Sequence, residues 1–128
     1  GNLASLCPVS KPVFVEYSIK GLERVVGAME SSGHKHSQTV EAFQTNGNPY
    51  VILSFNTSVR IPDGAKGWEI VRLVIEATGA KVVSDPFAGI GQTAKAVIGC
   101  GAIYHGSEIN PARYESLRKV VLKTETAK

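Results

Sequence analysis

The sequence is poor in cysteine and contains no long apolar run. Cys7 and Cys100 are its only 2 cysteines, and they form neither a disulfide framework nor a Cys-x-x-Cys metal motif. No apolar stretch approaches the roughly 20 residues that a membrane-spanning helix needs. The first residues also lack the charged start and apolar centre of a secretory signal. These absences predict a soluble, cytoplasmic protein without a membrane partner.

Charge of either sign is limited as well. The 14 Lys and Arg residues exceed the 11 Asp and Glu residues by a net charge of +3. This small excess permits an anionic partner such as DNA without requiring one. With 43% hydrophobic and 20% charged residues, the composition is that of an ordinary globular protein rather than a disordered one. A length of 128 residues is enough for one domain with its own core.

The first half of the chain alternates between strand-like and helix-like patterns. β-branched and aromatic residues alternate over residues 12–17 and predict a strand, whereas apolar residues recur at helical spacing over residues 19–29. The pair Asn46-Gly47 lies between two strand-like runs within residues 38–56. Because Asn-Gly tolerates positive φ angles, this pattern predicts an antiparallel hairpin.

The second half repeats a strand–helix order that is typical of a βαβ unit with parallel strands. Gly79 is expected to end the first helix of this half, and Asn110 is expected to cap the last one. We expect the strands of both halves to form one continuous sheet. The predicted elements are a helix over residues 68–78, a strand over 80–84, a helix over 93–98, a strand over 102–108 and a helix from residue 111.

The stretch VVSDPFAGIGQTAKAV, residues 82–97, places an acid, a proline and an aromatic ring before two glycines. Gly89 and Gly91 precede a helix start, where unpaired N–H groups and the positive dipole end favour a polar or anionic ligand. Glu108 follows at a spacing suited to binding ribose hydroxyls. Three interpretations are open: a tight turn without a ligand, a dinucleotide site of the G-x-G-x-x-G/A type, and an S-adenosylmethionine site.

Three segments carry a family resemblance. DPFAGIGQT resembles the D-P-F-x-G-x-G-T-T motif of amino-methylating DNA methyltransferases, which form N6-methyladenine or N4-methylcytosine. GAIYHGSEINPARYESLRK is similar to the strand and helix that follow this motif, and KGWEIVRLVIEATG is similar to the helix before it. The resemblance covers residues 66–119. It implies S-adenosyl-L-methionine as cofactor, DNA as partner and an α/β, three-layer Rossmann-like methyltransferase fold, small or incomplete, with an antiparallel hairpin at one sheet edge.

The resemblance also implies a role for each residue of the cofactor site. Ile90 and Gln92 depart from the serine and the threonine that are commoner at these positions of the motif. By resemblance, Asp85 lies near the methionine amino group, Phe87 packs against the cofactor, Gly89 and Gly91 make the close turn, Thr93 holds the helix start, Glu108 binds the ribose, and Ile109 and Asn110 flank the adenine.

The catalytic loop of this family has no clear counterpart. These enzymes activate an exocyclic amine with a (D/N/S)-P-P-(Y/F) loop whose aromatic ring stacks on the flipped base. The nearest match, Asn48-Pro49-Tyr50, lacks one proline, and an ordinary set of hairpin residues is the favoured interpretation. Three alternatives follow: a methyltransferase that uses these residues, a chain complemented by a second chain with the loop, and a catalytically inactive binding or regulatory protein. A nicotinamide-dinucleotide-binding domain is a further alternative.

We expect a single methyltransferase-like domain over residues 1–128. Within it, residues 1–56 form a strand–helix–hairpin portion, residues 57–67 a connection and residues 68–128 the cofactor-binding βαβ portion. No metal is expected, because His34 and His36 have no nearby cysteine or carboxylate to complete a zinc site. The segment around these two histidines is predicted to be a solvated loop.

Overall fold

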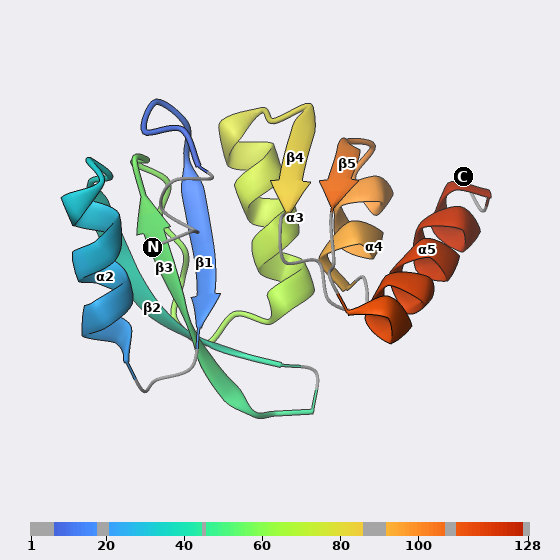
Figure 1. Cartoon of the computed structure of the whole chain (residues 1–128), viewed down its shortest axis with the longest axis horizontal. Coiled ribbons are helices and arrows are strands. Elements are labelled where there is room, and N and C mark those ends of the chain that lie inside the picture. The colour runs from blue at the N-terminus through green and yellow to red at the C-terminus, as the bar shows by residue number, and fades with distance from the viewer. Residues whose placement is uncertain (1–6, 18–20, 45, 86–91, 107–109, 127–128) are drawn as a thin grey trace. The chain divides into compact units, whose positions relative to one another are not determined.

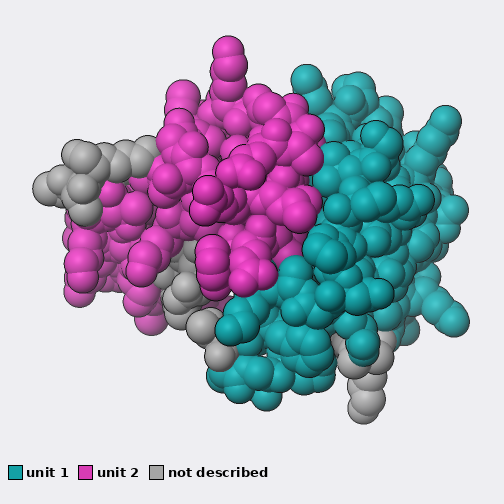
Figure 2. Space-filling view, turned by 180° about the vertical axis from the view of Figure 1, so that it is seen from behind, with its two compact units in different colours: residues 1–67 teal, residues 68–128 magenta. Residues whose placement is uncertain are grey.

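The structure is a computed structural model that describes residues 7–17, 21–44, 46–85, 92–106 and 110–126 (Figure 1). The chain divides into two compact units, residues 1–67 and residues 68–128 (Figure 2). Over the described ranges, no helix is both long enough and apolar enough to cross a membrane. The elements are β1 (Val13–Tyr17), α2 (Leu22–Ser31), β2 (His36–Phe43), β3 (Pro49–Phe55), α3 (Gly67–Thr78), β4 (Val82–Asp85), α4 (Gln92–Gly99), β5 (Ile103–Gly106) and α5 (Pro111–Thr126).

The first unit is built on a three-stranded antiparallel sheet in the order β1-β3-β2. The hairpin predicted around Asn46-Gly47 is confirmed as β2 and β3. Gly47 has a φ of 88°, which is easy for a residue without Cβ. The N–H of Gly47 donates to the carbonyl of Gln44, and the N–H of Gln44 donates to the carbonyl of Asn48, both at 2.9 Å. The connection is therefore longer than a two-residue turn.

Helix α2 covers one face of this sheet. Alternate residues of β3 point to the same face, and Val51, Leu53 and Phe55 bury their side chains there against Met29 of α2. Ile52 and Tyr50, on the opposite face of β3, are buried as well, and burial on both faces explains why this central strand is the most apolar of the three. The remaining members of the cluster are Val13, Val15 and the partly buried Cys7, Leu22, Val25 and Val26.

The two histidines lie in different environments. His34 is only 2% exposed, and its Nδ1 lies 2.9 Å from the Nδ2 of Asn56. Asn56 has a φ of 61°, and its Oδ1 accepts a hydrogen bond of 2.8 Å from the N–H of Lys35. His36 is exposed, with its Nε2 2.9 Å from the Oγ1 of Thr39. The predicted solvated loop is therefore wrong for His34, which is buried, and His36 is solvated as predicted but begins strand β2.

The second unit contains the parallel pair of strands β4 and β5, joined through α4. Helices α3 and α4 pack on the face of the pair that carries Val83 and Tyr104, through Ile75 and Val97. The predicted βαβ order is confirmed. The described strands pair as a three-stranded sheet in the first unit and a two-stranded sheet in the second, and the continuous sheet stays a prediction.

The predicted helix ends are confirmed in the second unit. Gly79, with a φ of 67°, donates its N–H to the carbonyl of Ile75 at 2.9 Å and ends α3. The Oδ1 of Asn110 accepts hydrogen bonds from the N–H groups of Ala112 and Arg113 at 3.0 and 3.2 Å and caps α5.

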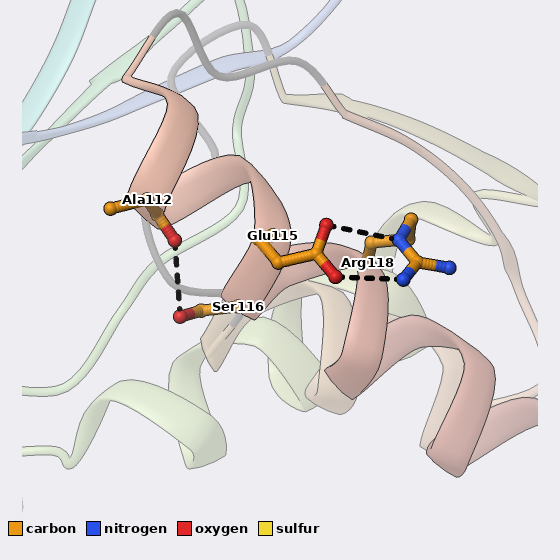
Figure 3. Close-up of polar contacts among 4 residues, drawn as sticks. All are labelled: Ala112, Glu115, Ser116 and Arg118. Carbon is orange, nitrogen blue, oxygen red and sulfur yellow. Dashed lines mark hydrogen bonds and ion pairs between the residues drawn. The ribbon is translucent and has the colours of Figure 1, made fainter.

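Beyond the cap, the outer surface of α5 carries local polar contacts (Figure 3). Glu115 pairs with Arg118 at 2.7 Å, and the Ser116 hydroxyl donates to the carbonyl of Ala112 at 3.3 Å.

The core of the first unit predicts that two phenylalanines contribute very differently to the free energy of unfolding. Phe55 is 0% exposed and Phe43 is 39% exposed. We expect Phe55→Ala to lower the free energy of unfolding by about 3–5 kcal/mol, because it removes a buried ring and leaves a cavity. The matched control Phe43→Ala should cost about 1 kcal/mol. Urea unfolding followed by circular dichroism measures both, and equal losses would contradict the described core.

Candidate functional site

The carboxyl ends of β4 and β5 form the edge where the candidate site lies. The two strands run parallel with Asp85 opposite Gly106, so their carboxyl ends lie side by side at the same end of the sheet (Figure 1). In open α/β sheets, ligands bind in the crevice outside the carboxyl ends of the strands. Helix α4 begins at Gln92, soon after β4 ends. A strand end that carries a carboxylate, Asp85, and the start of helix α4 are therefore only a few residues apart in the chain.

Three residues of the sequence-predicted cofactor site fall within the described part of the chain. Asp85 is the last residue of β4 and is half-buried, and Thr93 is the second residue of α4 and is also half-buried. Asn110 is exposed and caps α5. The other five predicted cofactor-site residues lie outside the described residues: Phe87, Gly89, Gly91, Glu108 and Ile109.

The Asp85 carboxylate is held by a tyrosine from the neighbouring strand. The hydroxyl of Tyr104 donates a hydrogen bond of 2.9 Å to the Oδ2 of Asp85. Tyr104 is paired with Val83, so its side chain reaches along β5 to the level of Asp85. Burial, with the charge of Asp85 and the hydrogen bond to it, raises the pKa of the Tyr104 phenol above its ordinary value. The phenol therefore keeps its proton at neutral pH and acts as a hydrogen-bond donor to Asp85.

Gly106 makes room for this tyrosine. A Cβ at Gly106 would collide with the ring and hydroxyl of Tyr104. Tyr104 and Gly106 are two residues apart on β5 and face the same side, so the ring lies over the glycine on its way to Asp85. Sequence reasoning missed both residues. The available signal was an aromatic residue two positions before a glycine at a strand end, next to a parallel strand that ends in an acid.

The weak catalytic candidates Asn48, Pro49 and Tyr50 lie in the hairpin of the first unit. Asn48 and Pro49 are exposed, and the carbonyl of Asn48 accepts the N–H of Gln44 in the turn. Tyr50 is 8% exposed on β3. Its hydroxyl packs against Gly67, where an added Cβ would lie 3.0 Å away. The ring of Tyr50 is thus a packed side chain of the sheet.

The pKa of Tyr50 predicts a specific alkaline sensitivity. Burial, and secondly the charge of Glu16, raises this pKa from 10.0 to about 12. The contribution of Tyr50 to stability is therefore complete below its unfolded pKa and is lost as the pH rises through the folded pKa. Between about pH 10 and pH 12, we expect the free energy of unfolding to fall less steeply for Tyr50→Phe than for the unsubstituted chain.

Urea unfolding at a series of alkaline pH values measures these slopes. Tyr114→Phe is the matched control, since Tyr114 is 50% exposed on α5. Equal slopes for the Tyr50 variant and the unsubstituted chain would show that Tyr50 is not buried as described.

Comparison with solved structures identifies the architecture. M1.HpyAVI in complex with SAM superposes with a TM-score of 0.71 at 12% sequence identity, over 91% of this chain and 76% of that chain. TTHA0409 from Thermus thermophilus, described as a DNA modification methylase and complexed with S-adenosyl-L-methionine, superposes with a TM-score of 0.69 at 14% identity, over 95% of this chain and 73% of that chain. No protein-family model and no curated protein sequence matches the chain.

The chain has the methyltransferase fold. The α/β fold class predicted from the sequence, with its antiparallel hairpin, is thereby confirmed. At 12–14% identity, the similarity establishes the fold, whereas the ligand and the reaction have to be argued from the residues of this chain.

Proposed function

We propose that this chain is an S-adenosylmethionine-binding domain of the DNA amino-methyltransferase type, with its cofactor site at the carboxyl ends of β4 and β5. The observation that carries the proposal is the Asp85 carboxylate, which ends β4 and accepts the Tyr104 hydroxyl at 2.9 Å. A carboxylate at this edge suits the ammonium group at the amino-acid end of the cofactor. Two of the neighbouring methyltransferase structures contain the same cofactor.

Each proposed contact uses a group whose chemistry fits one part of the cofactor. Asp85 binds the ammonium group, and the start of α4 near Thr93 offers backbone N–H groups to polar atoms. Gly89 and Gly91 allow the cofactor to approach the backbone, Phe87 packs against it, Glu108 accepts the ribose hydroxyls, and Ile109 and Asn110 flank the adenine. When bound, the sulfonium supplies an electrophilic methyl group.

Among the described residues, no side chain is assigned to activate the methyl acceptor. Tyr50 is buried, so its ring is not available in the described hairpin to stack on a flipped base, whereas Asn48 is exposed but lacks the second proline of the family's loop. This favours a chain that binds the cofactor and relies on a second chain for the catalytic loop and for DNA methylation. A regulatory protein that retains only cofactor binding is the alternative.

The exposed face of β4 and β5 supports the need for a further partner. Val82 and Ile103 point to the side opposite α4 and are 51% and 58% exposed. Parallel strands are almost always covered on both faces, because helices pack on each side. The same face also carries the exposed polar residues Ser84 and His105, and we propose that a second chain covers it.

Calorimetry with S-adenosylhomocysteine tests the cofactor proposal. We expect a measurable binding heat for the unsubstituted chain at ligand concentrations up to about 1 mM. Asp85→Asn and Glu108→Gln should each weaken binding about tenfold or more, because each removes a charge-assisted hydrogen bond.

Glu115→Gln is the matched control, since Glu115 lies on the exposed surface of α5 and pairs with Arg118. The affinity of this variant for S-adenosylhomocysteine should equal that of the unsubstituted chain. A titration with NAD is run in parallel. Absence of heat with S-adenosylhomocysteine, or tighter binding of NAD, would reject the proposed cofactor.

A methyl-transfer assay separates the two functional alternatives. With labelled S-adenosylmethionine and unmethylated DNA of varied sequence, we expect no label transfer by this chain alone and transfer after addition of a chain that carries the catalytic loop. Transfer by the isolated chain that is lost in Asn48→Ala would instead assign catalysis to the hairpin. Cofactor binding without transfer under either condition would favour the regulatory protein.

A further inference from the structure

We propose that Tyr104 is a positioning residue of the candidate cofactor site, which orients the Asp85 carboxylate for a ligand that carries an ammonium group. This inference rests on the proposed function, because it assigns the ligand's amino-acid end to Asp85. It adds a residue from β5, a strand that the sequence motif around Asp85 does not include. The geometry of the two strand ends carries this assignment.

The parallel register brings the two side chains together. Val83 pairs with Tyr104 and Asp85 with Gly106, so all four residues face the same side of the two-stranded sheet. The hydroxyl of Tyr104 donates to the Oδ2 of Asp85 at 2.9 Å, and this hydrogen bond favours one orientation of the carboxylate.

The tyrosine is itself held in place by both helices that flank β5 in the chain. Its ring contacts the cluster formed by Val97 of α4 with Ala102, and the cluster formed by Ala94 of α4 with Leu117 of α5. Gly106 removes the Cβ that would collide with the ring. The ring is therefore fixed between packed elements, and its hydroxyl is fixed at the carboxyl ends of the two strands.

A neutral hydrogen-bond donor suits a residue that orients Asp85 for an ammonium group. Lysine or arginine in place of Tyr104 would also bind the carboxylate, but its positive charge would compete with the ammonium group of the ligand. The phenol of Tyr104 orients the Asp85 carboxylate but, being neutral, does not cancel the negative charge of Asp85. Burial and the charge of Asp85 raise the pKa of the phenol, which keeps the hydroxyl protonated while Asp85 is ionised.

The test compares two ligands that differ at the amino-acid end. S-adenosylhomocysteine carries the ammonium group, whereas 5′-methylthioadenosine keeps the adenosine and the sulfur but lacks it. We expect Tyr104→Phe to weaken binding of S-adenosylhomocysteine about 3- to 10-fold, the value of one hydrogen bond, and to change binding of 5′-methylthioadenosine less than about twofold. Tyr114→Phe, on the exposed surface of α5, is the matched control and should change neither affinity.

A double substitution shows whether Tyr104 acts through Asp85. In the Asp85→Asn background, Tyr104→Phe should cause no further loss of S-adenosylhomocysteine binding. Gly106→Ala keeps the phenol but displaces the ring, so it should reproduce the ligand-selective loss of Tyr104→Phe. Thermal unfolding of each variant shows that the loss occurs in folded protein.

The outcomes are distinct. A selective loss for S-adenosylhomocysteine, absent in the Asp85→Asn background, supports the positioning role. Equal losses for both ligands, or a lowered melting temperature with unchanged affinities, would overturn it and leave Tyr104 as a structural tie between strands. If the unsubstituted chain binds 5′-methylthioadenosine and S-adenosylhomocysteine equally well, the cofactor site stands and the positioning role fails. If it binds neither, the proposed function fails first.

Discussion

The parallel pairing of β4 with β5 is the interaction on which the proposed site depends. Parallel strands end at the same edge, so this pairing places Asp85 level with Gly106 even though 20 residues separate them in the chain. A shift of one residue in this register would turn Tyr104 to the opposite face and away from Asp85. The register is stabilised by burial of Val83 and Tyr104 against α3 and α4. The contacts that pack the second unit thus also fix the positions of Asp85 and Tyr104 in the proposed site.

Much of this architecture follows from local sequence signals. Asn110 caps α5 and Gly79 ends α3 because each residue suits its backbone position. Asn46-Gly47 marks the hairpin for the same reason. Such signals depend on a few neighbouring residues, and so they can be read without knowledge of tertiary contacts. The D-P-F-x-G-x-G resemblance likewise places Asp85 at the end of a strand, where the structure has it.

The features that the sequence did not reveal depend on contacts between distant residues. The bond between Tyr104 and Asp85 requires the register of two strands, which no local pattern specifies. His34 was expected in a solvated loop, but Asn56, 22 residues further along, holds it in the interior. In each case, long-range packing decided the outcome where local propensity left several arrangements open.

The cofactor half and the catalytic half of a methyltransferase place different demands on a chain. Binding needs rigid backbone and one well-oriented carboxylate, and the second unit provides the carboxylate at a packed sheet edge. Base methylation also needs an accessible aromatic ring, whereas Tyr50 is enclosed and its pKa is raised to about 12. An enclosed ring that stabilises β3 cannot at the same time stack on an incoming base. Stability of the hairpin and catalysis by the hairpin are therefore competing uses of one side chain, and the burial of Tyr50 favours stability.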